Sequence, residues 1–123
     1  MTAKRFEDLE AYQRADELKR EVYALLATQT ASKDFKFCSQ LREAAASAPR
    51  NIAEGFGRFR PAPFAQFMEI AIASTMETQV SIQDGVDRHH FTRDQTSRAR
   101  SLAERSLQVS TKLLKYLKGC RDH

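Results

Sequence analysis

Three basic side chains near the end of the chain recur at seven-residue steps: Arg98, Arg105 and Lys112. Because seven residues are about two turns of an α-helix, this spacing places the three charges along one flank of a helix. Such a row suits contact with nucleic-acid phosphates, which bind arginine and lysine whatever the base sequence. The alternative is a solvated helix face whose cations pair with acidic helices beside it.

The distribution of charge along the chain is uneven. Residues 92–121 carry eight basic and two acidic side chains, a balance of +6, whereas residues 1–28 carry five basic and six acidic ones, a balance of −1. This asymmetry favours an acidic partner, with nucleic acid, RNA or DNA, as the first candidate. No aromatic residue is evident as an exposed platform for base stacking, which argues against a single-strand binder of that type. A second basic group is expected at one end of the molecule: Arg50, Arg58 and Arg60.

Enzyme and metal sites are not evident in the sequence. The Glu-x-x-His spacing of di-iron bundles and the His-Glu-x-x-His run of zinc proteases are both missing. His89 and His90 are adjacent, so on a helix they would point about 100° apart and could not chelate one ion. Cys38 has no nearby histidine and is expected to be a small core residue, and with Cys120 it makes too few cysteines for a disulfide framework. We therefore predict no enzyme activity, no catalytic residue, no metal and no cofactor.

The length and composition suit one helical domain. The 123 residues, 14.0 kDa and 41% apolar, allow a single domain over residues 1–123. The longest apolar runs, such as residues 70–73, are far short of the roughly 20 residues of a membrane span. The first residues lack the apolar stretch of a signal peptide, so a cytoplasmic protein without a membrane partner is expected.

Apolar residues recur at helical rather than strand-like spacing throughout the chain. The pattern predicts an all-α protein, an antiparallel up-down-up-down four-helix bundle with short connections. Gly55 and Gly57 are expected to end the second helix with positive φ, and the fourth is expected to begin at a capping box of Thr92 and Gln95. The helices are expected at about residues 7–28, 34–56, 62–87 and 92–118.

Two of the predicted helices carry more apolar surface than one core needs. In the third, Ile70, Ile72, Met76 and Val80 lie outside the main apolar stripe. In the fourth, a second stripe lies about 100° from the first. Because a large exposed apolar patch usually marks an interface, we expect a homo-oligomer that uses the large side chains of this second stripe. Its members are Ala103, Leu107, Ser110 and Leu114, of which Leu107 and Leu114 are the candidate interface.

The segment around Pro49 is unusual for a helix. Pro49 removes a backbone donor and costs about 3 kcal/mol inside a helix, which it is expected to kink. Ser47 and Asn51 are short polar side chains placed to satisfy backbone groups near that kink. Glu54 is expected to form a buried ion pair near the proline, with Arg42 or Arg50.

The same segment carries the pattern Q-L-R-x-A-x-x-S-x-P-x-N-I-A-E-G. Its residues here are Gln40, Leu41, Arg42, Ala44, Ser47, Pro49, Asn51, Ile52, Ala53, Glu54 and Gly55. The pattern resembles the hallmark of the 23S rRNA-intervening-sequence protein family, a bacterial four-helix-bundle family. The resemblance implies an antiparallel bundle in a ring-shaped oligomer, typically a pentamer. It also implies a relation to the accessory variability protein of diversity-generating retroelements, a basic barrel that contacts a reverse transcriptase and nucleic acid.

Two functions are compatible with the sequence. The first is a non-enzymatic oligomeric bundle that binds nucleic acid electrostatically. The alternative is a scaffold that binds another protein and has no role with nucleic acid, its basic residues serving solubility. Salt distinguishes the two, since phosphate binding weakens steeply as salt rises and apolar docking does not.

Overall fold

The computed structural model describes residues 3–28 and 31–120, and every regular element within these ranges is helical. Two short 3-10 helices, η1 (Phe6–Asp8) and η2 (Ala31–Lys33), precede the first two α-helices. Among the described residues, no helix combines the length and the apolar character that crossing a membrane requires. The all-α class is confirmed, and the α-helices are α1 (Glu10–Leu26), α2 (Phe35–Phe56), α3 (Pro61–Asp87) and α4 (Ser97–Gly119).

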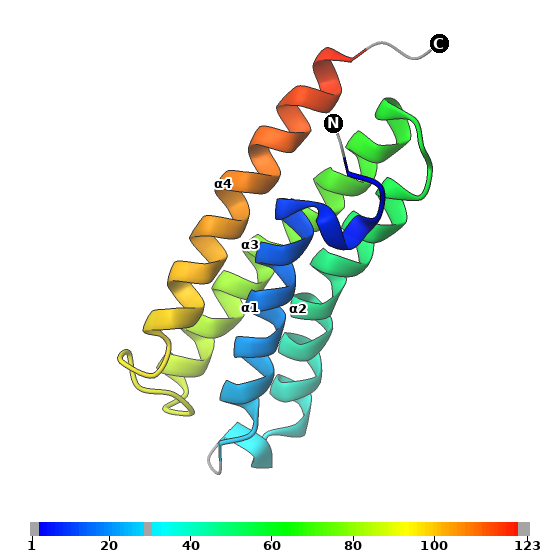
Figure 1. Cartoon of the computed structure of the whole chain (residues 1–123). Helices are drawn as coiled ribbons and strands as arrows, with labels where there is room; N and C mark the ends of the chain where they lie inside the picture. The colour runs from blue at the N-terminus through cyan, green and yellow to red at the C-terminus, as the bar shows by residue number, and fades with distance from the viewer. Residues whose placement is uncertain (1–2, 29–30, 121–123) are drawn as a thin grey trace.

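The four α-helices pack as a bundle (Figure 1). α1 packs against α2 and α4, and α3 packs against the same two helices. Between α1 and α4, Arg98 lies 3.4 Å from Glu21 and Arg105 lies 3.1 Å from Glu10. In these two ion pairs the residue number rises along α4 as it falls along α1.

Two clusters of buried side chains fill the bundle. One contains Val22, Leu41 and Ile82, and the other contains Ile52 and Met68. All five side chains are fully buried and come from α1, α2 and α3. Since burying one such side chain contributes about 1.5–3 kcal/mol, the two clusters supply the main stabilisation of the fold.

The face of α4 that packs in the core includes two members of the predicted second stripe. Ala103 and Ser110 are buried, although the sequence pattern placed them in a second, outward stripe with Leu107 and Leu114. Their small side chains let α4 lie close to its neighbours, and the larger residues on both flanks are consequently only half-buried. The buried residues of α4 are Ala99, Ala103, Ser106, Ser110 and Leu117.

The predicted start of the fourth helix is wrong, although its capping interaction is present. The Thr92 backbone N–H donates to Gln95 Oε1 at 2.8 Å, and the Gln95 N–H donates to Thr92 Oγ1 at 3.1 Å. These bonds close a separate turn, in which the Thr96 N–H donates to the Arg93 carbonyl at 3.2 Å. α4 therefore begins at Ser97.

The glycines of the α2–α3 connection do not have the predicted positive φ. Gly57 has φ −68°, and Gly55 lies inside α2. Gly55 is required by close packing, since a Cβ there would lie 2.7 Å from Phe64 Cδ1 and 2.8 Å from Phe67 Cβ. The left-handed conformation occurs instead at Phe59, with φ 59°.

Candidate nucleic-acid interface

The basic flank predicted on the fourth helix exists, and most of its charge is paired. Arg98, Arg105 and Lys112 are all exposed on α4. Arg98 and Arg105 form the ion pairs with Glu21 and Glu10 described above. Lys112 lies within ion-pair distance of no carboxylate among residues 3–28 and 31–120. The flank therefore lies beside the acidic edge of α1.

The ion pair of Arg105 leaves this arginine available to a stronger partner. The side chains of Arg105 and Glu10 are 56% and 53% exposed, so water and salt screen their attraction. Exposed pairs of this kind contribute only about 0–1 kcal/mol. A phosphate that reaches the flank could therefore displace Glu10 from Arg105 at small cost.

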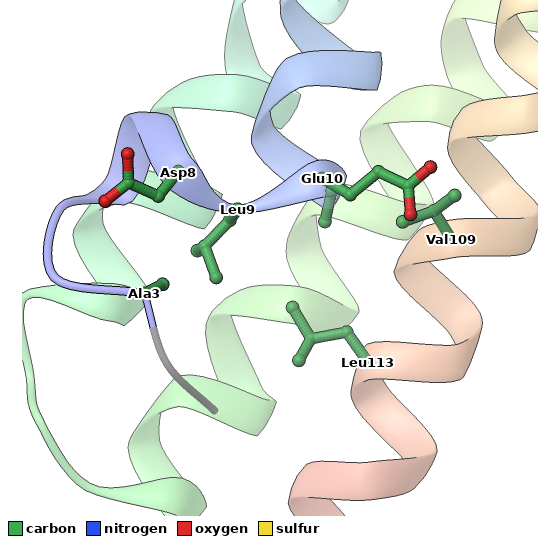
Figure 2. A pocket seen from close by; sticks show the side chains of 7 residues that line it. Ala3, Asp8, Leu9, Glu10, Val109 and Leu113 are labelled. Carbon is green, nitrogen blue, oxygen red and sulfur yellow. The ribbon is translucent and has the colours of Figure 1, made fainter.

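A hollow lies where this flank meets the start of α1 (Figure 2). It measures about 360 Å³, and Leu9, Val109 and Leu113 give it an apolar lining. Of its two carboxylates, Asp8 accepts the backbone N–H groups of Lys4 and Arg5, and Glu10 pairs with Arg105. Both carboxylates thus have partners within the chain.

The second predicted basic group divides between two hollows at one end of the bundle. Arg50 and Arg58 line one of about 550 Å³, where Arg50 pairs with Glu43 at 3.0 Å and Arg58 with Glu54 at 3.0 Å. Arg60 lines a different hollow, between the α2–α3 connection and the end of α4. The structure thus brings the three arginines to one end without gathering them around a single point.

The buried ion pair expected of Glu54 is wrong. The Glu54 side chain is 56% exposed and pairs with Arg58, one helical turn onward, rather than with Arg42 or Arg50. Arg58 lies in the turn that follows α2, four residues after Glu54, and helical spacing of this kind brings two side chains to one surface. Gln40 and Arg42 are also exposed, whereas Pro49 and Ile52 are buried, so the motif extends from the surface into the core of the bundle.

Ser47 and Asn51 form a short polar network between α2 and α3. Asn51 Nδ2 donates to the Ser47 carbonyl at 2.8 Å and to Ser47 Oγ at 3.0 Å, and Ser47 Oγ lies 2.7 Å from Ser74 Oγ. The carbonyl that Pro49 leaves without its helical donor belongs to Ala45, four residues before it. The network thus joins two helices and does not replace that missing bond.

This difference between Asn51 and Glu54 gives a stability prediction. Asn51→Ala removes two hydrogen bonds in a half-buried network and should lower the free energy of unfolding by about 1 kcal/mol. Glu54→Ala removes one exposed ion pair and should change it by less than about 0.5 kcal/mol. Thermal unfolding measures both, with a shift of about 4 °C expected for Asn51→Ala. If Asn51→Ala melts as the wild type does and loses nucleic-acid binding, the residue belongs to a binding site.

His90 connects the α3–α4 connection to the start of α2. Its Nε2 lies 2.8 Å from Asp34 Oδ2, and Asp34 also accepts the Phe37 backbone N–H at the start of the helix. The bond with His90, followed by that with Phe37, lowers the pKa of Asp34. Within the described ranges no cluster of histidine, cysteine, aspartate and glutamate has the make-up of a metal site.

Cys38 is a core residue, as predicted. It is buried, and its thiol donates to the Ala31 carbonyl at 3.0 Å. Burial raises the pKa of the Cys38 thiol, which keeps it protonated and unreactive at neutral pH.

Two aromatic residues that the sequence pattern did not predict as exposed lie at the end of the bundle that holds Arg60. Phe59 is 83% exposed and Tyr116 is 52% exposed, and both line the same hollow as Arg60. The expectation that no exposed aromatic platform exists is therefore wrong. A signal was present in the sequence, since Phe59 lies between two arginines and outside every apolar stripe.

Comparison with known proteins finds one family. The family model described as 23S rRNA-intervening sequence protein matches residues 7–112. This range contains α1, α2, α3 and most of α4, together with the whole polar motif around Pro49. No curated protein matches the chain.

Proposed function

The chain belongs to the 23S rRNA-intervening sequence protein family, and from this premise we propose that it is a non-enzymatic bundle that binds nucleic acid electrostatically. In this proposal the bundle is antiparallel, up-down-up-down, and it assembles into a ring-shaped homo-oligomer, most simply a pentamer. The exposed cations of each copy then repeat around the ring. A modest charge on one copy becomes a strong local potential in the assembly.

The positive flank of α4 carries the nucleic-acid part of the proposal. Arg98, Arg105 and Lys112 project from one side of a single helix. Of the two carboxylates that pair with the arginines, Glu10 is 53% exposed and Glu21 is 23% exposed. Phosphate groups satisfy such cations through charge-assisted hydrogen bonds, without reading base edges. Binding should accordingly be independent of sequence and sensitive to salt.

Side-chain pairs and exposed apolar residues support the proposed arrangement and assembly. Lys118, near the end of α4, lies 3.4 Å from Glu69, near the start of α3, as expected for helices that run in opposite directions. Ile70, Met76 and Val80 are between 48% and 70% exposed on α3, and a second copy would bury them. Apolar surface of this kind is typical of interfaces.

A titration with duplex DNA and RNA in increasing salt tests the proposal. The wild type should bind with a steep log–log salt dependence, because each phosphate contact contributes a slope of about −0.9 on duplex DNA. Replacing Arg98, Arg105 and Lys112 by alanine should weaken binding roughly tenfold at low salt and flatten the slope by up to about 2.7 for each engaged subunit. Different sequences should be affected equally.

The matched control removes the same charge elsewhere. Arg20, Lys33 and Lys36 are exposed on α1, η2 and α2, and their replacement by alanine should weaken binding much less than loss of the α4 flank. Equal losses in the two triple variants would show that net charge, and not the α4 flank, governs binding. Absence of binding by the wild type in low salt would remove the nucleic-acid proposal.

The second candidate function is a scaffold that binds another protein. The pairing of Arg98 and Arg105 with α1 favours it, because those arginines are partly neutralised within the chain. On this alternative the apolar surface of α3 docks the partner, and the cations serve solubility. Binding that persists in high salt would favour the scaffold.

A further inference from the structure

A hollow with aromatic walls and basic residues lies at the end of the bundle where α2 passes into α3. It measures about 300 Å³, within the range of small-ligand sites. Figure 1 shows the contributing segments together: the start of the chain, the α2–α3 connection and the end of α4. Its walls include Phe56, Phe59, Phe64 and Tyr116, and its basic residues are Lys4 and Arg60.

Phe59 is held out from the bundle in a strained conformation. Its φ of 59° is unusual for a bulky residue. Gly57, which could adopt a positive φ without strain, instead has φ −68°. The Phe59 N–H donates to the Phe56 carbonyl at 3.2 Å, and the two rings lie edge to face with centroids 6.2 Å apart. The Phe59 ring is thus 83% exposed although its backbone is strained and its edge contacts Phe56. Backbone strain of this kind is typical of functional sites.

Tyr116 supplies a second aromatic surface in the same hollow. It is 52% exposed on the last turns of α4. Interaction with the Cys120 side chain raises the pKa of Tyr116, so its phenol is uncharged at neutral pH. A neutral phenol does not repel a phosphate and can stack on a base.

The charge around the hollow favours an anion. Lys4 and Arg60 line it. None of the described residues that line the hollow is acidic. Aromatic faces beside cations match the two features of a nucleotide, its base and its phosphate.

We propose that this hollow binds single-stranded nucleic acid, with a base stacked on Phe59 beside Tyr116 and phosphates held by Lys4 and Arg60. The inference rests on the proposed function only in naming nucleic acid as the ligand. It differs in site and in chemistry, because stacking requires unpaired bases whereas the α4 flank contacts phosphates of any strand. Single strands are therefore bound at the end of the bundle.

A tryptophan reporter tests the contact directly. The chain has no tryptophan, so Phe59→Trp places one indole in the hollow. A short oligouridine should quench its fluorescence as a base stacks on it. The matched control is Phe35→Trp, because Phe35 is 80% exposed at the opposite end of α2, and its fluorescence should not change. Absence of quenching at position 59, or equal quenching at both positions, overturns the proposal.

A second variant separates binding from folding. Phe59→Asn removes the ring and introduces a residue that tolerates positive φ, so the protein should melt no lower than the wild type. Its affinity for oligouridine should fall about tenfold, the effect of losing one stacked base. The factor should be the same at low and high salt, since the phosphate contacts are unchanged, and duplex affinity should not change. An equal loss for duplex, or a change in oligomer mass that marks Phe59 as a contact between copies, overturns the proposal.

The same measurements distinguish this site from the α4 flank. If the protein binds duplex but the fluorescence of Phe59→Trp is not quenched, the proposed single-strand site in the hollow is wrong and the proposed function remains. Quenching that survives replacement of Arg98, Arg105 and Lys112 by alanine shows that the hollow binds single strands independently of the α4 flank. Quenching in a protein that does not bind duplex even with these three residues intact supports the hollow and removes the α4 flank.

Discussion

Replacing Gly85 by alanine should lower the free energy of unfolding by about 2 kcal/mol. Gly85 lies in the last turn of α3, where a Cβ would approach Phe91 Cδ2 and Cε2 to 2.5 Å and Phe37 Cζ to 2.8 Å. Overpacking of this kind costs about 3 kcal/mol, and the better helix propensity of alanine returns about 1 kcal/mol. Denaturant unfolding followed by circular dichroism measures the change.

Gly119 provides the matched control for this substitution. It ends α4 with nothing within 4 Å of an added Cβ, so Gly119→Ala should leave stability unchanged or raise it. Placing Gly85→Ala in a Phe91→Leu background should recover part of the loss, because the smaller side chain gives the methyl group room. If Gly85→Ala is as stable as Gly119→Ala, the packing of Phe91 on α3 differs from that described.

The middle of the fold follows closely from the sequence. α2 and α3 begin and end within one residue of the predicted bounds, since Asp34 accepts the Phe37 N–H at one start and proline occupies the first turn at the other. α4 was placed too early because the Thr92 capping box closes a turn before the helix. Local hydrogen-bonding signals of this kind do not reveal whether the chain continues as a helix.

The candidate site was only partly predictable. Seven-residue spacing correctly placed Arg98, Arg105 and Lys112 on one exposed flank. Their partners Glu10 and Glu21 lie in α1, and which helix lies beside which depends on tertiary packing that the spacing does not contain. Periodicity also assigned Ala103 and Ser110 of α4 to a second stripe outside the core, whereas close approach of the helices buries their small side chains.

The ion pair between α3 and α4 also indicates which surface of these two helices would contact a second copy in the proposed oligomer. Leu107 lies about three helical turns before Lys118 in α4. Val80 lies the same number of residues after Glu69 in α3. Because Lys118 pairs with Glu69, the proposed antiparallel arrangement sets Leu107 level with Val80 on one surface of α3 and α4. Met76 lies one turn from Val80 and is 54% exposed, and Leu114 lies two turns from Leu107. The predicted interface residues thus continue onto α3.

Val80→Glu combined with Met76→Glu should convert the proposed oligomer to a species of 14.0 kDa. Val80 is 70% exposed and Met76 is 54% exposed, so the fold should tolerate both changes, whereas an apolar interface would bury two charges in each copy. These residues are better tests than Leu114, which packs partly against the core. Light scattering at micromolar concentration measures the mass, with a wild-type mass near 14.0 kDa contradicting the oligomer itself. Gln83→Glu, exposed on the same helix, is the control, and retention of the oligomer by the double variant would place the interface away from this surface.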